Sequence, residues 1–318
     1  MLDFDEKIQF AERKNNILTI GELLIDMIPD EYGDQLEATT FQKYFGGSPS
    51  NIAMNVKKLG IDSLVVSAVG KDGFGEYLVK QLQQASIDTS YIQRVNKATS
   101  LVVVSKSTHQ PVPIFYRGAD YHLRYTKQTE EAILQSNIVH FSCWPISKQP
   151  ARETVEKVIN TAKKHNIWIG FDPNYHPLIW EQGEDGVAYI KSLVEKVDFV
   201  KPSEDDAERL FGKDSPENQI KKFLGLGAKL VIMTLGRDGA IASNGKEWVS
   251  FPSLATDVID TTGAGDAFWS GFYTALIKGY TIRKSIELGF AVSAYKLLYT
   301  GAIVPLPSLE KIKNKYHL

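Results

Sequence analysis

Asp260-Thr261-Thr262-Gly263-Ala264-Gly265-Asp266 is the segment from which the rest of this chain is best interpreted. It is a turn of small residues that leads directly into an apolar helical pattern over residues 267–276. Because glycine has no side chain, a ligand can approach the backbone closely at Gly263 and Gly265. The first amides of the helix lack intrahelical partners and point toward the turn. The turn is therefore predicted to be an anion site.

Asp266 lies at the lip of this predicted anion site. A carboxylate in that place is either a helix cap or a base beside a bound phosphate, and the turn alone does not decide between them. Its helix-terminal position favours the ionised form. As a base it would therefore be weak and suited to a late proton transfer.

Composition excludes several classes of protein. The chain has 318 residues, with 36 basic and 38 acidic side chains and no block of like charge, so we expect neither a nucleic-acid nor a membrane-surface partner. No run of about 18 apolar residues predicts a membrane span. Residues 1–16 are charged throughout, unlike a signal peptide, which favours a cytoplasmic location. A single cysteine, Cys143, excludes an internal disulfide and a cysteine-based zinc site.

Strand-like and helical apolar patterns alternate along the chain, most regularly after residue 130. The alternation predicts a parallel sheet with right-handed crossovers. The strands are expected at 17–21, 63–69, 138–142, 167–171, 198–201, 229–235, 240–243 and 247–251. The helices are expected at 49–59, 76–85, 129–135, 150–164, 186–194, 207–211, 216–225, 267–278 and 282–299. No repeat, low-complexity tract or linker occurs, so we expect one domain over residues 1–318.

Two insertions interrupt this alternation, at about 23–45 and 99–120. Both contain short strand-like runs, which predict a small antiparallel sheet that could act as a lid over a site. Arg117 ends one of these runs and is either a ligand for an anionic or polyhydroxyl molecule or simply a solvated arginine.

Several polar residues are expected at the carboxyl ends of the parallel strands, where open α/β sheets bind ligands. Asp26 follows the first strand, and Asp172 and Asn174 follow another. Gly46 and Gly47 precede a helix start and allow close backbone approach. Each of these features taken alone could also be an ordinary turn or cap.

Two common phosphate-binding motifs are absent. Gly21 is followed by Glu22 and then by apolar residues instead of the dinucleotide-binding fingerprint, which weakens a dehydrogenase interpretation. No P-loop occurs anywhere in the chain. Nucleotide phosphates must therefore be held by another device.

The chain resembles the ribokinase-like, or phosphofructokinase-B, family of carbohydrate kinases. Two signatures carry the resemblance: Gly46-Gly47-Ser48-Pro49-Ser50-Asn51-Ile52-Ala53 with Gly60 beyond it, and Asp260 to Asp266 with Ser270-Gly271 beyond it. They lie about 200 residues apart in the order found in the family. The resemblance extends from about residue 17 to residue 307. It implies an α/β fold: a doubly wound, mainly parallel sheet with helices on both faces and a small antiparallel β lid.

The resemblance also implies roles for individual residues. Asp266 matches the catalytic base, and the anion hole matches Gly263, Ala264 and Gly265. The sugar hydroxyls would be bound by Asp26, Gly46, Gly47 and Asn51, with Arg117, Asp172 and Asn174 added from the lid and the strand ends. The nucleotide would be bound by Ser203, Thr234, Gly236 and Gly239. The cofactors implied are ATP with Mg²⁺, which Asp206 would orient through water, and K⁺ at a monovalent cation site on Asp260 and Thr262.

This chain departs from the family pattern in two places. Ser203-Glu204-Asp205-Asp206 stands where the family commonly has Asn-x-x-Glu, which keeps the polarity and charge but alters the geometry for Mg²⁺. Residues 290–294, Phe-Ala-Val-Ser-Ala, lack the asparagine often present there, so the adenine pocket cannot be assigned from sequence.

The resemblance is greatest to bacterial fructokinases, on Phe115-Tyr116-Arg117 and on Phe171 to Asn174 with Trp180. We therefore expect transfer of the γ-phosphoryl group of ATP to O6 of fructose. The alternatives are 2-keto-3-deoxygluconate kinase, where Arg117 would bind a carboxylate, and 5-dehydro-2-deoxygluconokinase. A sugar- or nucleotide-sensing protein without activity is the alternative from another class. The expected partners are sugar and ATP, and the lid strands could also pair two subunits into a homodimer.

Overall fold

The computed structural model describes residues 2–30, 38–104 and 113–318. Its centre is a nine-stranded sheet in the order β13-β12-β11-β10-β9-β8-β1-β4-β5. The pairs from β11 to β5 are parallel, and β12 and β13 are antiparallel. The strands are β1 (Asn15–Ile20), β4 (Ser63–Gly70), β5 (Ile92–Val95), β8 (Ser136–Ser142), β9 (Trp168–Asp172), β10 (Phe199–Val200), β11 (Leu230–Thr234), β12 (Ala240–Ser243) and β13 (Trp248–Phe251).

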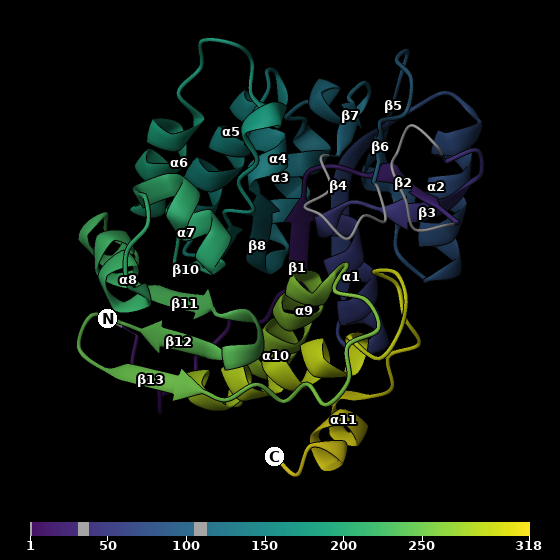
Figure 1. The fold of residues 1–318 in the computed structure, drawn as a ribbon. Coiled ribbons are helices and arrows are strands. Elements are labelled where there is room, and N and C mark those ends of the chain that lie inside the picture. The colour runs from purple at the N-terminus through teal and green to yellow at the C-terminus, as the bar shows by residue number, and fades with distance from the viewer. Residues whose placement is uncertain (1, 31–37, 105–112) are drawn as a thin grey trace.

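A second sheet of four strands, in the order β3-β2-β6-β7, lies at the corner opposite β13 (Figure 1). Its strands are β2 (Leu24–Pro29), β3 (Phe41–Gly46), β6 (Leu101–Val103) and β7 (Ile114–Tyr116). The pairs β2–β3 and β6–β7 are antiparallel, and a parallel pairing of β2 with β6 joins them. Parts of both predicted insertions, at 31–37 and 105–112, lie outside the described residues.

Helices cover both faces of the large sheet. Alternate residues of β1 enter different cores: Ile17 packs with α1 (Ser48–Lys58), α9 (Ala264–Ile277) and α10 (Ile282–Lys296), whereas Leu18 packs on the other side. The other face is covered by α3 (Lys127–Leu134), α4 (Cys143–Ile146), α5 (Ala151–Lys164), α6 (Gly186–Val194), α7 (Glu204–Phe211) and α8 (Pro216–Gly225). The helix α2 (Gly73–Gln84) packs near β4 and the small sheet, and α11 (Leu309–Lys315) lies at the periphery (Figure 1).

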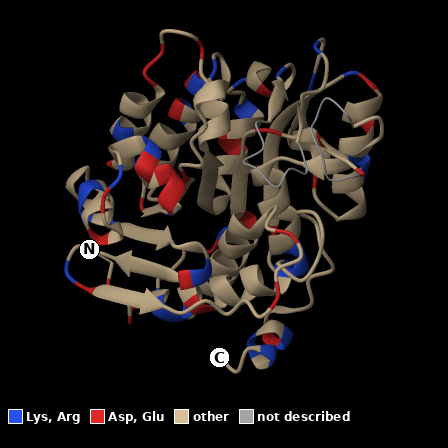
Figure 2. Cartoon of the chain, viewed as in Figure 1, with Lys and Arg blue, Asp and Glu red and all other residues tan. Residues whose placement is uncertain are grey.

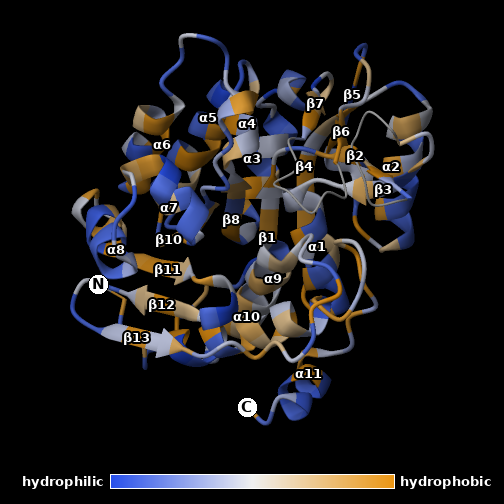
Figure 3. Ribbon diagram, viewed as in Figure 1, coloured by the Kyte–Doolittle hydropathy of each residue, from blue (hydrophilic) through white to orange (hydrophobic). Residues whose placement is uncertain are grey.

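The burial pattern explains this layering. Figure 3 shows β1 and β4 mainly in hydrophobic colours, whereas α7 is mainly hydrophilic. The helix α9 is different, because every residue from Ala267 to Leu276 is buried. A helix that is apolar all round must be enclosed. It packs between α1 and α10, and so its N-terminus is held at the centre of the molecule.

The predicted fold class is confirmed, and most predicted elements lie within a few residues of their expected positions. The α2 helix begins at residue 73 rather than 76, because the Asp72 carboxylate accepts a hydrogen bond from the amide of Gly75 (2.8 Å) and caps it earlier. The short elements β5, α4 and α11 were not predicted. Within the described ranges, none of the helices combines the length and apolar composition needed to cross a bilayer.

Positions of Lys and Arg alternate with positions of Asp and Glu along the chain in Figure 2. The clearest local group is acidic, at the first turn of α7, where Glu204, Asp205 and Asp206 follow one another. Acidic side chains at a helix N-terminus are ordinary partners of the helix dipole.

Candidate active site

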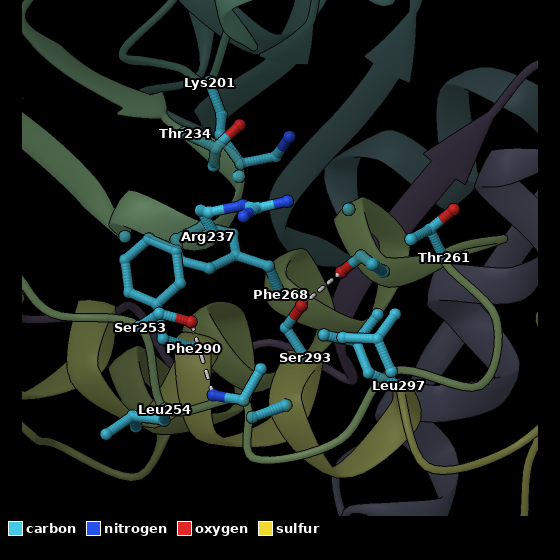
Figure 4. A pocket seen from close by; sticks show the side chains of 17 residues that line it. Lys201, Thr234, Arg237, Ser253, Leu254, Thr261, Phe268, Phe290, Ser293 and Leu297 are labelled. Carbon is cyan, nitrogen blue, oxygen red and sulfur yellow. Dashed lines mark hydrogen bonds between the residues drawn. The ribbon is translucent and has the colours of Figure 1, made fainter. Parts of the chain in front are cut away.

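The carboxyl ends of three neighbouring strands place polar groups at one edge of the large sheet. Asp172 ends β9, Lys201 directly follows β10, and Thr234 ends β11. Pairing of β9 with β10 and of β10 with β11 brings these ends together. Figure 4 shows Lys201 and Thr234 on one side of a cavity, with Arg237 below them.

This cavity has a volume of about 760 Å³ and lies between the β11–β12 turn, the Gly263 turn and α10. Five residues predicted for the nucleotide and the anion hole line it: Thr234, Gly236, Gly239, Ala264 and Gly265. Its far wall is apolar and includes Phe290, Ala294 and Leu297 (Figure 4). An apolar wall facing a cation and a glycine turn suits a molecule with a flat base at one end and anionic groups at the other.

The two glycines of the turn serve different purposes. Gly263 caps α9 with a left-handed φ of 76°, and a side chain there would lie 2.7 Å from the Cβ of Ala302. Gly265 faces the cavity, and a Cβ at that position would lie 3.4 Å from Lys201 Nζ. Gly263 is thus required by the fold, whereas Gly265 keeps space open beside a cation.

Lys201 is a site residue that the sequence did not indicate. Only 5% of it is exposed, and its Nζ lies 3.0 Å from Oδ2 of Asp172. The same carboxylate oxygen accepts a hydrogen bond from Nε1 of Trp269 (2.8 Å). Asp172, predicted to bind sugar, therefore holds a lysine at the edge of the cavity. Asn174 is exposed two residues further on, with a φ of 34°.

Asp266 joins the two glycine-containing signatures. Its Oδ1 accepts a hydrogen bond from Ser48 Oγ (2.6 Å), and its Oδ2 accepts one from Asn51 Nδ2 (2.9 Å). Burial raises the pKa of Asp266 to about 6, the Ser48 and Asn51 hydrogen bonds lower it, and the charge of Asp172 adds to the rise. Burial therefore opposes the ionised form that the helix terminus favours, and it raises the pH at which the carboxyl loses its proton.

Two more carboxyls lie beside the Gly46–Gly47 turn. Glu22 is buried and accepts a hydrogen bond from the Ser48 amide (3.2 Å). Burial raises its pKa to about 8, and burial together with the Asp266 charge raises the pKa of Asp26 to about 7. Side chains at Gly46 and Gly47 would collide with the Asp26 carboxylate and the Glu22 carbonyl. Glu22 was missed because a lone glutamate after a strand carries no motif.

Arg117 has partners within the protein for all five of its N–H donors. Its Nε and Nη2 donate to Oδ2 of Asp120 (2.9 and 2.6 Å), and its Nη1 donates to Ser147 Oγ and the Ile179 carbonyl (2.5 and 3.2 Å). A second Nη2 bond reaches the Trp144 carbonyl (3.3 Å). A ligand could bind Arg117 only by breaking these bonds, so this arrangement does not support its predicted role and indicates a framework residue instead.

Ser203 and Asp206 form a reciprocal capping box at the start of α7. Asp206 Oδ2 accepts from the amide and hydroxyl of Ser203 (3.0 and 2.7 Å), and its Oδ1 accepts from the Tyr175 amide (2.8 Å). Burial and the nearby Asp172 charge raise the pKa of Asp206. Ser203 lies outside the residues that line the cavity. The altered Asn-x-x-Glu position therefore has a local structural role in the described chain.

The predicted monovalent cation site holds a side chain. Asp260 Oδ1 accepts from the Thr262 amide (2.9 Å) and Oδ2 from the Gly301 amide (2.7 Å). The carbonyl of Asp260 accepts a hydrogen bond from the ammonium of Lys296 (2.6 Å). Lys296, the last residue of α10, was not singled out in the sequence because nothing local marks it as close to the turn.

The model of one family, described as pfkB family carbohydrate kinase, matches residues 14–309. The chain belongs to the pfkB family of carbohydrate kinases. Two further comparisons, one with curated proteins and one with solved structures, agree with this assignment. The chain is 60% identical over 318 residues, all of this chain and 99% of the relative, to an ATP-dependent 6-phosphofructokinase of Thermoanaerobacterium thermosaccharolyticum. It is 42% identical to a fructokinase structure of Halothermothrix orenii, with a TM-score of 0.80, over 86% of this chain and 97% of that chain.

A 5-dehydro-2-deoxygluconokinase of Clostridium beijerinckii is 30% identical over 323 residues, 97% of this chain and 95% of the relative. The names of these relatives are thus those of kinases of different sugars. The predicted family is confirmed, and the chain is an ATP-dependent sugar kinase. The interpretations as a sensor without activity and as a dehydrogenase are not supported.

Proposed function

We propose that the acceptor is a ketohexose in its furanose form, and that fructose 6-phosphate is the preferred one. The observation that carries the choice of sugar is the 60% identity to an ATP-dependent 6-phosphofructokinase over the whole chain. Free fructose, our prediction from sequence, is the second candidate, favoured by the 42% identity to a fructokinase structure. A ketohexofuranose carries a primary hydroxyl at C1 and another at C6. One site can therefore phosphorylate O6 of fructose or, where C6 is already esterified, O1.

The charges beside the Gly46–Gly47 turn support an acceptor that offers hydroxyls. Glu22, Asp26 and Asp266 present carboxyl groups there, and Asn51 adds an amide. Carboxylates accept hydrogen bonds from hydroxyls, and protonated carboxyls also donate them. Arg117, the arginine expected to bind a sugar acid, is engaged within the protein. The engagement of Arg117 disfavours 2-keto-3-deoxygluconate and 5-dehydro-2-deoxygluconate as acceptors.

We place ATP in the cavity of about 760 Å³, with the adenine against Phe290, Ala294 and Leu297 and the phosphates toward Gly265 and Lys201. The described residues include no group of three or more His, Cys, Asp or Glu side chains arranged to hold a metal. Mg²⁺ fits here as a partner of the phosphates that keeps most of its water, with Asp206 as a nearby carboxylate. When bound, it neutralises part of the phosphate charge.

In this proposal Asp266 takes the proton of the attacking hydroxyl, and Ser48 and Asn51 orient its carboxylate. The amides at Gly263 to Gly265 and the Lys201 ammonium stabilise negative charge on the transferring phosphoryl group. Phosphoryl transfer depends mainly on positioning and on charge, because its transition state is loose. The Asp172 carboxylate holds Lys201 in place at 3.0 Å.

A substrate panel tests the acceptor. ADP release with ATP should be fastest with fructose 6-phosphate, slower with fructose, and slowest with 2-keto-3-deoxygluconate, 5-dehydro-2-deoxygluconate, ribose and adenosine. Carbon NMR of the product should show the new ester at C1 for fructose 6-phosphate. Preference for free fructose would restore our sequence-based prediction, and preference for either sugar acid would overturn the proposal.

A homodimer through the lid remains a prediction. Tyr116 on the outer strand β7 is an exposed aromatic residue (58%). Light scattering coupled to size exclusion would measure the mass of the particle, and Tyr116→Glu should lower it only if the lid pairs subunits.

A further inference from the structure

Lys296 is a fully buried lysine beside the Asp260–Asp266 turn. None of its surface is exposed, and its Nζ donates to the carbonyl of Asp260 at 2.6 Å. In the part of the chain that the structure describes, this carbonyl is the one hydrogen-bond acceptor found for the ammonium. Burying an ammonium group is costly unless it is paired. A charge kept in such a place therefore calls for an explanation beyond packing.

Backbone amides orient the Asp260 side chain. Its two carboxylate oxygens accept the amides of Thr262 and Gly301. The segment after α10 closes the same region, because Ala302 packs directly against Gly263. Backbone carbonyls and carboxylates are the oxygen ligands that alkali cations use. Here the carbonyl is already bound by an ammonium with the same charge as K⁺.

The charge of Lys296 acts on the catalytic turn. Burial lowers the pKa of Lys296, whereas Asp260 and Asp266 raise it, so the ammonium and the proposed base interact electrostatically. Leu297, the next residue, lines the nucleotide cavity, so the lysine is attached to a wall of that cavity. A fixed positive charge behind the turn makes its potential more favourable for an anion. The ammonium would repel a second cation at the same carbonyl.

We propose that the Lys296 ammonium is a tethered substitute for the monovalent cation, so that turnover does not require K⁺. Lys296 is a positioning residue in this account, because it acts through the turn and does not touch the substrate. The inference rests on the proposed role of the turn as the phosphoryl site. It replaces our expectation of a K⁺ site at Asp260 and Thr262.

The test compares wild type with Lys296→Met in K⁺, NH₄⁺, Na⁺ and tetramethylammonium salts at equal ionic strength. Wild-type turnover should be the same in all four. The variant should be slower by about 10- to 100-fold in tetramethylammonium, the size of effect seen when outer-shell partners of an ion site are removed. K⁺ or NH₄⁺ should restore most of this loss, and Na⁺ less.

Thermal unfolding of the protein without substrates gives a second readout that does not depend on turnover. K⁺ should raise the Tm of Lys296→Met but not that of wild type. Lys58→Met is the matched control, because Lys58 Nζ also donates to a backbone carbonyl, that of Val304 (2.9 Å). The control should show neither the loss of turnover nor the rescue by K⁺.

Three results would overturn the inference: activation of wild type by K⁺, a Lys296→Met variant as active as wild type, or a variant that no cation rescues. If the variant does not fold, the wild-type cation series still decides. If wild type phosphorylates no sugar, the proposed function fails, whereas the Tm series continues to report on the cation site.

Discussion

The two glycine turns of this kinase, Gly46–Gly47 and Gly263–Gly265, look alike in sequence but differ in the charges around them. Three carboxyls whose pKa values are raised surround the first turn: Glu22, Asp26 and Asp266. Two lysines, Lys201 and Lys296, lie beside the second. Glycine provides close backbone approach in both. The side chains brought from elsewhere decide that one turn suits hydroxyls and the other suits an anion.

Asp266 belongs to both turns, and removing its charge should have the largest effect. Asp266→Asn keeps the shape and the hydrogen bond from Ser48 but cannot take a proton, so kcat should fall by about 10³-fold. Steady-state kinetics would measure the loss, and sugar binding by calorimetry should be nearly unchanged. Asp205→Asn, an exposed carboxylate on α7, is the control.

The pH profile sharpens the same assignment. The pKa of Asp266 is raised to about 6, so the base form is lost as pH falls through 6 rather than through 4. In wild type kcat/KM should decline below pH 6. A variant kcat within about tenfold of wild type, or an activity unchanged down to pH 5, would refute Asp266 as the base.

Removal of the positive charge at the second turn should have the next largest effect. Lys201→Met should lower kcat by about 100-fold, because the developing phosphoryl charge loses its cation, with a smaller change in KM for ATP. Lys201→Arg should recover part of the rate. The control is Lys229→Met, which removes the lysine of a pair with Asp198 at the opposite end of β10 (2.5 Å). A Lys201→Met variant that binds ATP weakly but keeps its kcat would limit Lys201 to ground-state binding.

Filling the space beside the second turn should impair catalysis less than removing the positive charge there. Gly265→Ala places a methyl group 3.4 Å from Lys201 Nζ, an ordinary contact in the free protein but an obstacle to a phosphate. KM for ATP should rise by about tenfold, with the Tm nearly unchanged. Gly225→Ala in α8 meets nothing within 4 Å and should leave KM unaltered. Normal ATP kinetics for Gly265→Ala would show that the phosphates lie elsewhere.

The smallest expected effect is on stability at the first turn. The pKa of Glu22 is raised to about 8, so the folded protein binds a proton more tightly than the unfolded chain. The stability from this group is complete below its unfolded pKa near 4.5 and is lost as pH rises through 8. Glu22→Gln, which does not titrate, should therefore become more stable relative to wild type as the pH rises from 5 to 8.

Chemical denaturation at both pH values would measure this difference. Asp214→Asn is the control of opposite sign, because Lys222 and Asn218 lower the pKa of that exposed carboxyl to about 2. A wild-type stability that rises from pH 5 to pH 8, with Glu22→Gln following it in parallel, would contradict the raised pKa of Glu22.

The sequence by itself determined the fold class, the family and the two glycine turns. These features are local: apolar periodicity sets each strand and helix, and glycine is needed wherever the backbone turns tightly or a ligand comes close. The alternation after residue 130 predicted helices 186–194 and 216–225 at their observed bounds. The folded chain then places the predicted base, Asp266, beside the first signature, where Ser48 and Asn51 donate hydrogen bonds to it.

Only the tertiary structure decided the charges around those turns. Lys201 and Asp172 are 29 residues apart and meet because β9 and β10 are neighbours, and Lys296 reaches Asp260 because α10 packs along α9. In sequence Arg117 matches a ligand residue, whereas in the structure its five N–H donors have partners within the protein. The raised pKa of Asp266 also depends on the tertiary structure, because desolvation is set by the groups that enclose a carboxyl and not by its neighbours in sequence.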